Sequence, residues 1–230
     1  MAKILLFMPT LGTVPTQIMT FIKKIESKHD VKFMTTSRVL IWAARNLALE
    51  ETVKNNCDYL CMVDDDNPIY YKNFIDMMVD DDKDIVSGVV RLRNNQKNLN
   101  ICSAKKVDGL DKYINYKTNP KQDLIQIANC GCGVVCIKRK VVDKLLEAYP
   151  RPFENKMTYY IKTKDWYDEF DPSVFGKGGF ETDDKGRLIF RTRELSEDYL
   201  AFERARRLGF EVWADTRITA VHLSNKIIKV

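Results

Sequence analysis

Three consecutive aspartates, Asp64-Asp65-Asp66, are the residues of this chain whose type and spacing most directly indicate chemistry. They follow the apolar run Tyr59–Val63, which predicts a short buried strand, and they precede Asn67-Pro68, a turn signal. Adjacent carboxylates repel one another unless a cation compensates. Aspartate oxygens suit Mg²⁺ or Mn²⁺, which commonly bridge carboxylates to substrate phosphates. A metal–phosphate site is therefore one interpretation of this run, and a solvated acidic turn is the other.

A second acidic run, Asp80-Asp81-Asp82, provides an internal comparison. It follows Phe74–Val79, which looks like a helix, so we expect a helix end and a loop there. Ligands of α/β sheets bind beyond the carboxyl ends of the strands. The strand that precedes Asp64 therefore distinguishes the first run from the second.

Other polar residues have an ordinary and a functional interpretation. Arg45 and Asn46 lie on the predicted helix Val39–Asn55, where a solvated helix face would explain both. Ser196-Glu197-Asp198 opens another predicted helix, where a serine cap with acidic residues in the first turn is common. His222 follows a short extended run, and a lone histidine in such a place is more often structural than a ligand.

Composition sets broad limits on the class of protein. The chain has 230 residues, of which 45% are hydrophobic and 30% charged, as in one soluble globular domain. Its net charge of +5 fits binding of a nucleotide or polyanion but is too small to predict a nucleic-acid partner. Met1-Ala2-Lys3 leads straight into a strand-like run, and no apolar stretch approaches the ~20 residues of a membrane span. We therefore expect neither signal peptide nor transmembrane segment, and a cytoplasmic location.

Several of the six cysteines lie inside apolar, strand-like segments, which favours reduced and packed thiols. Cys130-Gly131-Cys132 lacks the CxxC spacing and has no nearby histidine, so we do not expect a structural zinc site there.

The first hundred residues alternate between strand-like and helix-like segments, which is typical of a parallel sheet with right-handed crossovers. No GxGxxG or GxxxxGK[ST] motif is present, so neither a dinucleotide fold nor a P-loop is indicated. The predicted strands are Lys3–Met8, Val31–Thr35, Tyr59–Val63 and Asp84–Val90, and the predicted helices are Thr16–Lys28, Val39–Asn55 and Tyr71–Val79.

The second half is less regular. Residues 93 to 123 are polar and predict excursions and hairpins, and 151 to 192 alternate aromatic with charged residues. Gly176-Lys177-Gly178-Gly179 interrupts that stretch, so we expect residues about 163 to 190 to form a mobile, glycine-hinged segment over a substrate cleft. The remaining predicted elements are strands at Leu124–Asn129, Gly133–Ile137, Phe210–Ala214 and Ile218–Val221, and helices at Lys138–Tyr149 and from Ser196 to before Gly209.

The order of these motifs resembles that of GT-A glycosyltransferases and is similar to the inverting family-two enzymes. The resemblance covers residues 3 to 223 and implies an α/β, GT-A (nucleotide-diphospho-sugar transferase) fold, with a mixed, mostly parallel central sheet flanked by helices. It implies one domain over 1–230, with a nucleotide-binding half at 1–100 and an acceptor-side half at 101–230. The motifs that carry it are Asp64-Asp65-Asp66, Ser87-Gly88, Gly131 to Arg139, Ser196-Glu197-Asp198-Tyr199 with Phe202, Arg204 and Gly209-Phe210, and Asp215 to His222.

The resemblance assigns roles to the acidic run and to the histidine. Asp64 and Asp66 match the first and last residues of the family's DxD motif, and Asp65 fills its variable middle place. Asp66 would hold the Mn²⁺ or Mg²⁺ that bridges the donor diphosphate, while Asp64 would contact the nucleotide ribose or the metal shell. His222 matches a histidine that some GT-A families use as a further metal or phosphate ligand.

The resemblance also assigns the remaining site residues. Glu197 and Asp198 match the family's ED pair, in which the aspartate is the usual general base, so Glu197 is left to orient the acceptor or cap the helix. Pro9, Thr10 and Arg45 fall where the family binds its nucleotide.

The predicted activity is therefore metal-dependent transfer of one sugar from a UDP- or GDP-linked donor to an acceptor hydroxyl, with inversion. The QxxRW-type motif of the family's processive polymerases is absent, which favours single-sugar transfer. One alternative is a nucleotidyltransferase that makes sugar nucleotides. Such enzymes usually have a glycine- and arginine-rich loop after the first strand, whereas the corresponding loop here, Pro9–Pro15, has one glycine and no arginine. Another is a non-catalytic sugar- or nucleic-acid-binding module, against which the presence of Asp66, Asp198 and His222 argues.

Overall fold

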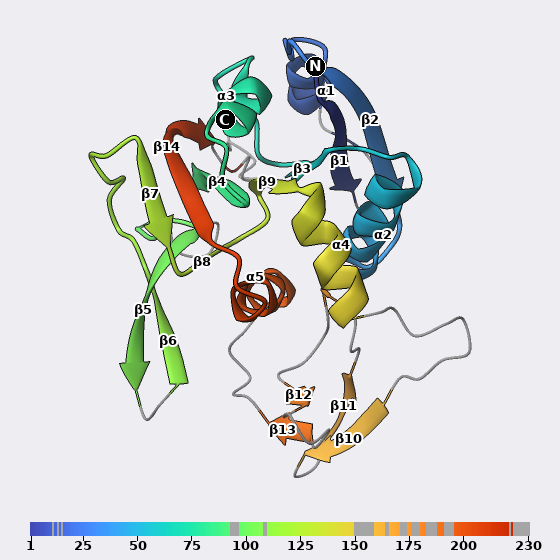
Figure 1. The fold of residues 1–230 in the computed structure, drawn as a ribbon, viewed down its shortest axis with the longest axis vertical. Coiled ribbons are helices and arrows are strands. Elements are labelled where there is room, and N and C mark those ends of the chain that lie inside the picture. The colour runs from blue at the N-terminus through green and yellow to red at the C-terminus, as the bar shows by residue number, and fades with distance from the viewer. Residues whose placement is uncertain are drawn as a thin grey trace, which may run out of the picture.

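A computed structural model of the chain describes residues 1–10, 12, 14, 16–92, 97–107, 110–149, 159–163, 166–170, 174–175, 180–182, 188–190, 196–220 and 222. Its centre is a seven-stranded sheet with the strand order β2-β1-β3-β9-β4-β14-β7 (Figure 1). The strands of this sheet are β1 (Lys3–Thr10), β2 (Asp30–Ser37), β3 (Tyr59–Val63), β4 (Ile85–Val90), β7 (Leu124–Ile127), β9 (Val134–Lys138) and β14 (Val212–Ala220).

Smaller sheets and the helices complete the described elements. The smaller strands are β5 (Ile101–Val107), β6 (Leu110–Asn115), β8 (Asn129–Cys130), β10 (Tyr159–Thr163), β11 (Trp166–Phe170), β12 (Phe180–Thr182) and β13 (Leu188–Phe190). The helices are α1 (Thr16–Ile22), α2 (Ile41–Lys54), α3 (Phe74–Asp80), α4 (Arg139–Ala148) and α5 (Glu197–Arg207). The β5–β6 hairpin confirms the excursion predicted between residues 93 and 123.

The central sheet is mixed and mostly parallel, as predicted. β1 is parallel to both β2 and β3, and β14 is parallel to β4. β9 lies between β3 and β4 and is antiparallel to both, while β7 is antiparallel to β14. The alternation of the first hundred residues therefore predicts the direction of β3 and β4 correctly, but it contains no sign of the later strand that separates them.

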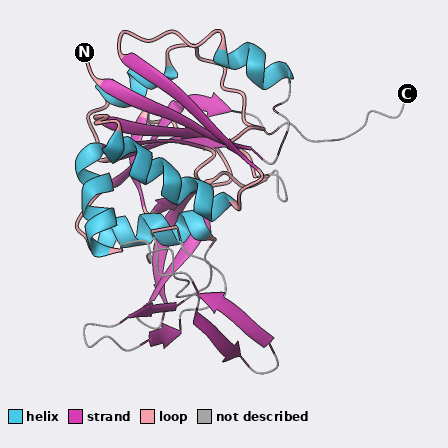
Figure 2. Ribbon diagram, turned by 90° about the vertical axis from the view of Figure 1, so that its right-hand side faces the viewer, coloured by secondary structure: helices cyan, strands magenta, loops and turns pink. Residues whose placement is uncertain are grey.

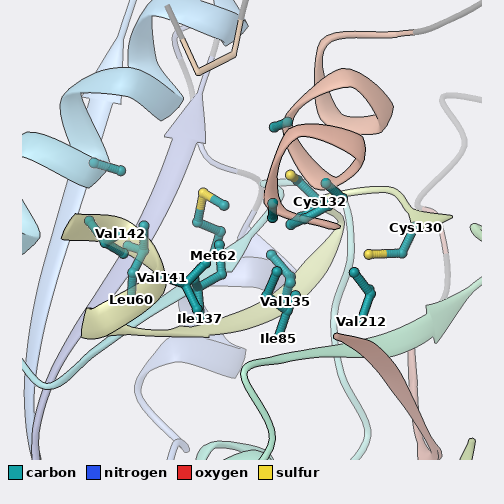
Figure 3. Close-up of a cluster of buried hydrophobic side chains, with 14 of the residues drawn as sticks. Leu60, Met62, Ile85, Cys130, Cys132, Val135, Ile137, Val141, Val142 and Val212 are labelled. Carbon is teal, nitrogen blue, oxygen red and sulfur yellow. The ribbon is translucent and has the colours of Figure 1, made fainter. Parts of the chain in front are cut away.

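Helices cover both faces of the middle of the sheet, where β1, β3 and β4 are buried on both sides. Leu5 and Phe7 of β1 pack with the apolar side chains of α2, α4 and α5 in one buried cluster. Figure 3 shows another part of this cluster, around Leu60 and Met62 of β3. The alternate residues Ile4, Leu6 and Met8 pack with α1 and α3. Figure 2 shows the resulting layers of helix, sheet and helix, with the sheet in the middle.

Several element boundaries differ from those predicted. α1 ends at Ile22 instead of Lys28, because the chain then turns toward α3: Glu26 N donates to Lys72 O at 3.0 Å. The strands predicted at 210–214 and 218–221 form one strand, β14, whose register opposite β4 shifts between Ala214 and Thr219. The strand predicted at 124–129 divides between β7 of the central sheet and β8 of a smaller one.

All six cysteines are buried, as expected of cysteines packed in a core. Among the described residues, no helix combines the length and the apolar character that crossing a membrane requires.

Half of the segment predicted to be mobile, 163 to 190, lies outside the described residues, and in the described half Val174 and Phe175 are fully buried in the core. Asn46 on α2 donates through Nδ2 to Phe175 O and accepts from Phe175 N through Oδ1, both at 3.0 Å. Arg204 on α5 donates to Val174 O at 3.1 Å. Three buried hydrogen bonds therefore fix this dipeptide to α2 and α5.

Candidate functional site

The predicted site residues meet at one edge of the central sheet. Asp64 follows the end of β3, and Gly133 precedes the antiparallel β9, so both lie at this edge, where Asp64 N donates to Gly133 O at 3.1 Å. α5 begins here as well, because Cys132 N donates to Asp198 Oδ2 at 3.2 Å. The topology thus brings Asp64 within reach of two carboxylates that are more than 130 positions later in the chain.

Arg45 joins these carboxylates. Its side chain is only 4% exposed, and its guanidinium lies 3.2 Å from Asp64 Oδ1 and 2.8 Å from Glu197 Oε1. The distance from Arg45 Nη1 to Asp198 Oδ2 is 3.8 Å. Arg45 and its neighbour Asn46 are therefore buried, and the interpretation of both as a solvated helix face is wrong. That interpretation fails because the groups that contact these two side chains, the carboxylates of α5 at Arg45 and the backbone of Phe175 at Asn46, are remote in sequence.

The electrostatics of this cluster follow from burial and close charges. Burial opposes the charge of Arg45, but Cys132 and the three carboxylates raise its pKa above the ordinary value, so the guanidinium stays charged. Burial also raises the pKa of Glu197, as does the charge of Asp198, whereas Arg45 lowers it. With its three carboxylates ionised, the cluster carries one positive and three negative charges, a formal excess of two negative charges that favours a nearby cation.

Asp198 is held in one orientation by its neighbours. Ser196 Oγ and the backbone N of Tyr199 donate to Oδ1, the latter at 3.3 Å, and Cys132 N donates to Oδ2. A Cβ at Gly131 would lie 3.3 Å from Asp198 Oδ2, so glycine lets the carboxylate approach the backbone. Glu197 and Asp198 occupy the first turn of α5, as predicted, but Ser196 makes no side-chain capping hydrogen bond. Both acids face Arg45.

Asp66 and His222 form a second part of the site. β14 ends at Ala220, at the same edge, and a bridge between Ile69 and Ala220 ties it to the loop that contains Asp66. His222 Nε2 lies 3.9 Å from Asp66 Oδ1, and His222 Nδ1 lies 2.5 Å from the carbonyl oxygen of Arg91. A carbonyl oxygen only accepts, so Nδ1 carries the proton. In the neutral ring, Nε2 is then the nitrogen with a free lone pair.

Asn67 is a site residue that the sequence marked only as part of a turn. Its side chain is fully buried, and its Nδ2 donates to Gly133 O at 3.4 Å. A Cβ at Gly133 would lie 2.6 Å from that nitrogen, so glycine makes room for the amide. Among the described residues, Asn67 Oδ1 is buried without a hydrogen-bond partner. A buried oxygen of this kind is expected to have a partner in the working protein.

The other predicted residues lie at the same edge. Pro9 and Thr10 are the last residues of β1, and the β1–β3 register, Phe7 opposite Met62, continues to place Pro9 beside Asp64. Both are buried, and Thr10 Oγ1 accepts from Gly12 N at 3.2 Å. Asp65 is half-buried between the two outer aspartates. Within the described part of the chain, no three His, Cys, Asp or Glu side chains form a ready metal cage.

The second acidic run ends α3, as predicted, but Asp81 is not a solvated residue. Its side chain is 8% exposed and accepts from Arg217 at 2.9 Å, and Arg217 also pairs with the fully buried Asp215 at 2.8 Å. Burial and the charge of Asp215 raise the pKa of Asp81 to about 6, although Arg217 opposes the shift.

This shift predicts a pH dependence of stability. Because the pKa of Asp81 is raised in the folded protein, its protonated carboxyl group adds to the free energy of unfolding below the ordinary aspartate pKa. This stabilisation is lost as the pH rises through about 6. The side chain of Asp81→Asn stays neutral at every pH, so this variant does not lose that stabilisation. The free energy of unfolding of the variant minus that of the wild type should therefore be larger at pH 7.5 than at pH 4, by roughly 1–3 kcal/mol. Urea unfolding at both pH values measures this difference.

Asp82→Asn is the matched control. Asp82 is exposed, and the hydrogen bond from Lys138 lowers its pKa, so its contribution is present at neutral pH and lost in acid. The pH dependence of this variant should therefore have the opposite sign. Parallel behaviour of the two variants would contradict the assignment of Asp81.

Comparisons with known proteins concern the fold. No protein-family profile matches the chain, and no curated protein sequence matches it. Among solved structures, it is similar to A197 from STIV, with a TM-score of 0.58 and 17% identity over 97% of this chain and 86% of that one. A mannose-1-phosphate geranyltransferase from Thermus thermophilus matches with a TM-score of 0.41 and 10% identity over 65% of this chain and 61% of that one. The first likeness is one of fold and extends over nearly the whole chain.

Proposed function

We propose that this chain is a GT-A glycosyltransferase that moves one sugar from a nucleoside-diphosphate donor to an acceptor hydroxyl, with inversion and with Mn²⁺ or Mg²⁺. The observation that carries the proposal is the meeting of Asp64, Glu197 and Asp198 around the buried Arg45, beside Asp66 and His222. These residues belong to α2, to α5 and to the segments that directly follow β3 and β14, at the strand ends where α/β sheets bind their ligands.

The residues beside Asp64 fit a divalent cation. Asp66 Oδ1 and His222 Nε2 are 3.9 Å apart, a separation at which one ion can contact both at about 2.0–2.2 Å. The contact of His222 Nδ1 with a backbone carbonyl is the arrangement that orients metal-binding histidines. Two protein ligands suit Mg²⁺ or Mn²⁺ in particular, because these ions complete their shell with water and substrate phosphates. When bound, such an ion would neutralise the charge that develops on the leaving diphosphate.

The chain's own side chains supply the remaining chemistry. Asp198 takes the proton of the attacking hydroxyl at its carboxylate, which its three hydrogen bonds hold in place. Arg45, expected at the nucleotide, is instead engaged by carboxylates, so we assign it the role of holding Asp64 and Glu197 in position. Glu197 orients the acceptor, and Pro9, Thr10 and Asp65 line the nucleotide side of the same edge.

The test of the metal and donor site is nucleotide-dependent stabilisation. UDP or GDP should raise the free energy of unfolding only with Mn²⁺ or Mg²⁺, by about 2.7 kcal/mol when the nucleotide is at 100 times its Kd. Thermal shifts with and without metal measure this. Asp66→Ala should abolish the gain and His222→Ala should weaken it, because each removes a ligand of the proposed ion.

Asp80→Ala is the matched control, because Asp80 belongs to the second acidic run and is exposed beside Lys28. Asp81 is unsuitable, since it is buried against Arg217. An equal loss of the gain in Asp80→Ala and Asp66→Ala would show that the wrong acidic run was chosen. Formation of pyrophosphate from a nucleoside triphosphate and a sugar phosphate would instead identify a nucleotidyltransferase, and donor binding without turnover would identify a binding module.

A further inference from the structure

Two buried cysteines face each other in the central sheet. Cys61 of β3 and Cys136 of β9 are register partners, and their side chains are essentially inaccessible to solvent. Their neighbours Leu60, Met62, Val135 and Ile137 face α2, α4 and α5 (Figure 3), so the two cysteines project from the opposite face, toward α1 and α3. The two Sγ atoms are 2.7 Å apart, closer than two non-bonded sulfur atoms rest.

The hydrogen-bond pattern of these strands defines the kind of pair they form. At one end of the ladder Asp64 N donates to Gly133 O, and at the other Arg139 N donates to Asp58 O. Hydrogen-bonded pairs alternate with non-hydrogen-bonded pairs along antiparallel strands. Counting inward from either end places Cys61 and Cys136 at a non-hydrogen-bonded pair. There the Cα atoms are about 4.5 Å apart, within the ~4.4–6.8 Å that a disulfide spans.

The other cysteines lack this geometry. Cys102 and Cys130 lie on the paired strands β5 and β8, but Cys102 is opposite Asn129 and Cys130 is opposite Ile101. The sulfur of Cys102 is instead 2.8 Å from the hydroxyl of Tyr199. Cys57 lies before β3, and its sulfur contacts the carbonyl of Asn55. Cys61 and Cys136 are thus distinguished by register as well as by distance.

We propose that Cys61 and Cys136 form a cross-strand disulfide by exchange with a small-molecule disulfide such as oxidised glutathione. One protein thiolate attacks the glutathione disulfide, which gives a mixed disulfide and releases one glutathione thiolate. The second protein thiolate then displaces the remaining glutathione, and the Sγ–Sγ bond forms. Two electrons pass from the protein thiols to the glutathione disulfide, and the two protons that the thiols lose protonate the two glutathione thiolates.

The cross-link forms while the sheet assembles. β9 is covered on both edges by β3 and β4, and burial raises the pKa of the Cys61 thiol, so the folded chain offers little reactive thiolate. The same burial protects the bond once it has formed. Cys61 precedes Asp64 by three positions and Cys136 follows Gly133 by three, so the disulfide joins the two strands that position Asp64 and Gly133 at the edge of the sheet.

Refolding tests the proposal. The unfolded, reduced chain is refolded in a mixture of reduced and oxidised glutathione, and in reduced glutathione alone. The oxidised product should have lost two hydrogen masses, and proteolytic mapping without reduction should yield one cross-linked peptide pair that contains Cys61 and Cys136. The disulfide closes a long loop of the chain, so the melting temperature of the oxidised protein should exceed that of the reduced protein by about 5–10 °C.

Variants in which one cysteine is replaced provide the controls. Cys57→Ala should keep the mass loss and the gain in melting temperature, whereas Cys136→Ala and Cys61→Val should lack both. The wild-type peptide map is decisive even if a core variant fails to fold. Six free thiols in the oxidised product, or a bond that joins any other pair, would overturn the proposal.

Discussion

Asp198→Asn is expected to lower turnover of a nucleoside-diphosphate sugar by about 10²–10⁴-fold while leaving the affinity for nucleotide and metal nearly unchanged. Asparagine keeps the size of the side chain, and its Oδ1 can still accept a hydrogen bond such as that from Cys132 N. It cannot take a proton from the acceptor hydroxyl. The loss should therefore appear in kcat, measured with a UDP- or GDP-sugar, beside a calorimetric Kd for the metal–nucleotide complex.

Glu197→Gln is the matched variant. Glu197 Oε1 and Asp198 Oδ2 both lie within 3.8 Å of Arg45 Nη1, so only separate substitutions can distinguish the roles of the two acids. Glutamine at 197 weakens the contact with Arg45 and should act mainly on the acceptor KM or on stability. Full activity of Asp198→Asn would remove Asp198 from the mechanism. A dead Glu197→Gln beside an active Asp198→Asn would assign the base to Glu197.

Arg45→Met should lower the free energy of unfolding more than substitution of any one carboxylate of the candidate site. Methionine fills a similar volume but leaves Asp64, Glu197 and Asp198 facing one another without the positive charge. Removing one partner of a buried ion pair costs about 3–5 kcal/mol. The three carboxylates keep some contact with water, so we expect about 3 kcal/mol, at the lower end of that range. Urea unfolding at neutral pH measures it.

The pH dependence separates this electrostatic cost from a packing cost. In the wild-type protein Arg45 lowers the pKa of Glu197 against the raising effects of burial and of Asp198, so the stabilisation that Arg45 gives to ionised Glu197 is lost as the pH falls and Glu197 protonates. The destabilisation by Arg45→Met should therefore be smaller at pH 4 than at pH 7.5. Arg139→Met is the control, because Arg139 pairs with Asp143 at a partly exposed position and its loss should cost less than about 1 kcal/mol. An equal loss at both pH values would contradict the assignment of Arg45.

The candidate site was predictable wherever its residues are adjacent to a recognisable element. The apolar run at 59–63 marks a buried strand in any tertiary context, so it placed Asp64 and Asp66 at a strand end. Glu197 and Asp198 were likewise placed in the first turn of α5. The amide of Asn67 was not predictable, because its burial depends on the absence of a side chain at Gly133, far along the chain.

Hydrophobic periodicity and turn residues act over a few positions, so they were enough to predict the α/β class, the direction of the early strands and the place of the acidic run after a strand. Tertiary structure alone decided that β9 enters between β3 and β4, and that Arg45 is buried against carboxylates 152 and 153 positions later. It also decided that Asp81 faces Asp215 instead of solvent. These contacts join charged side chains from remote elements. Their formation depends on which helix covers which strand end, and local sequence contains no measure of that choice.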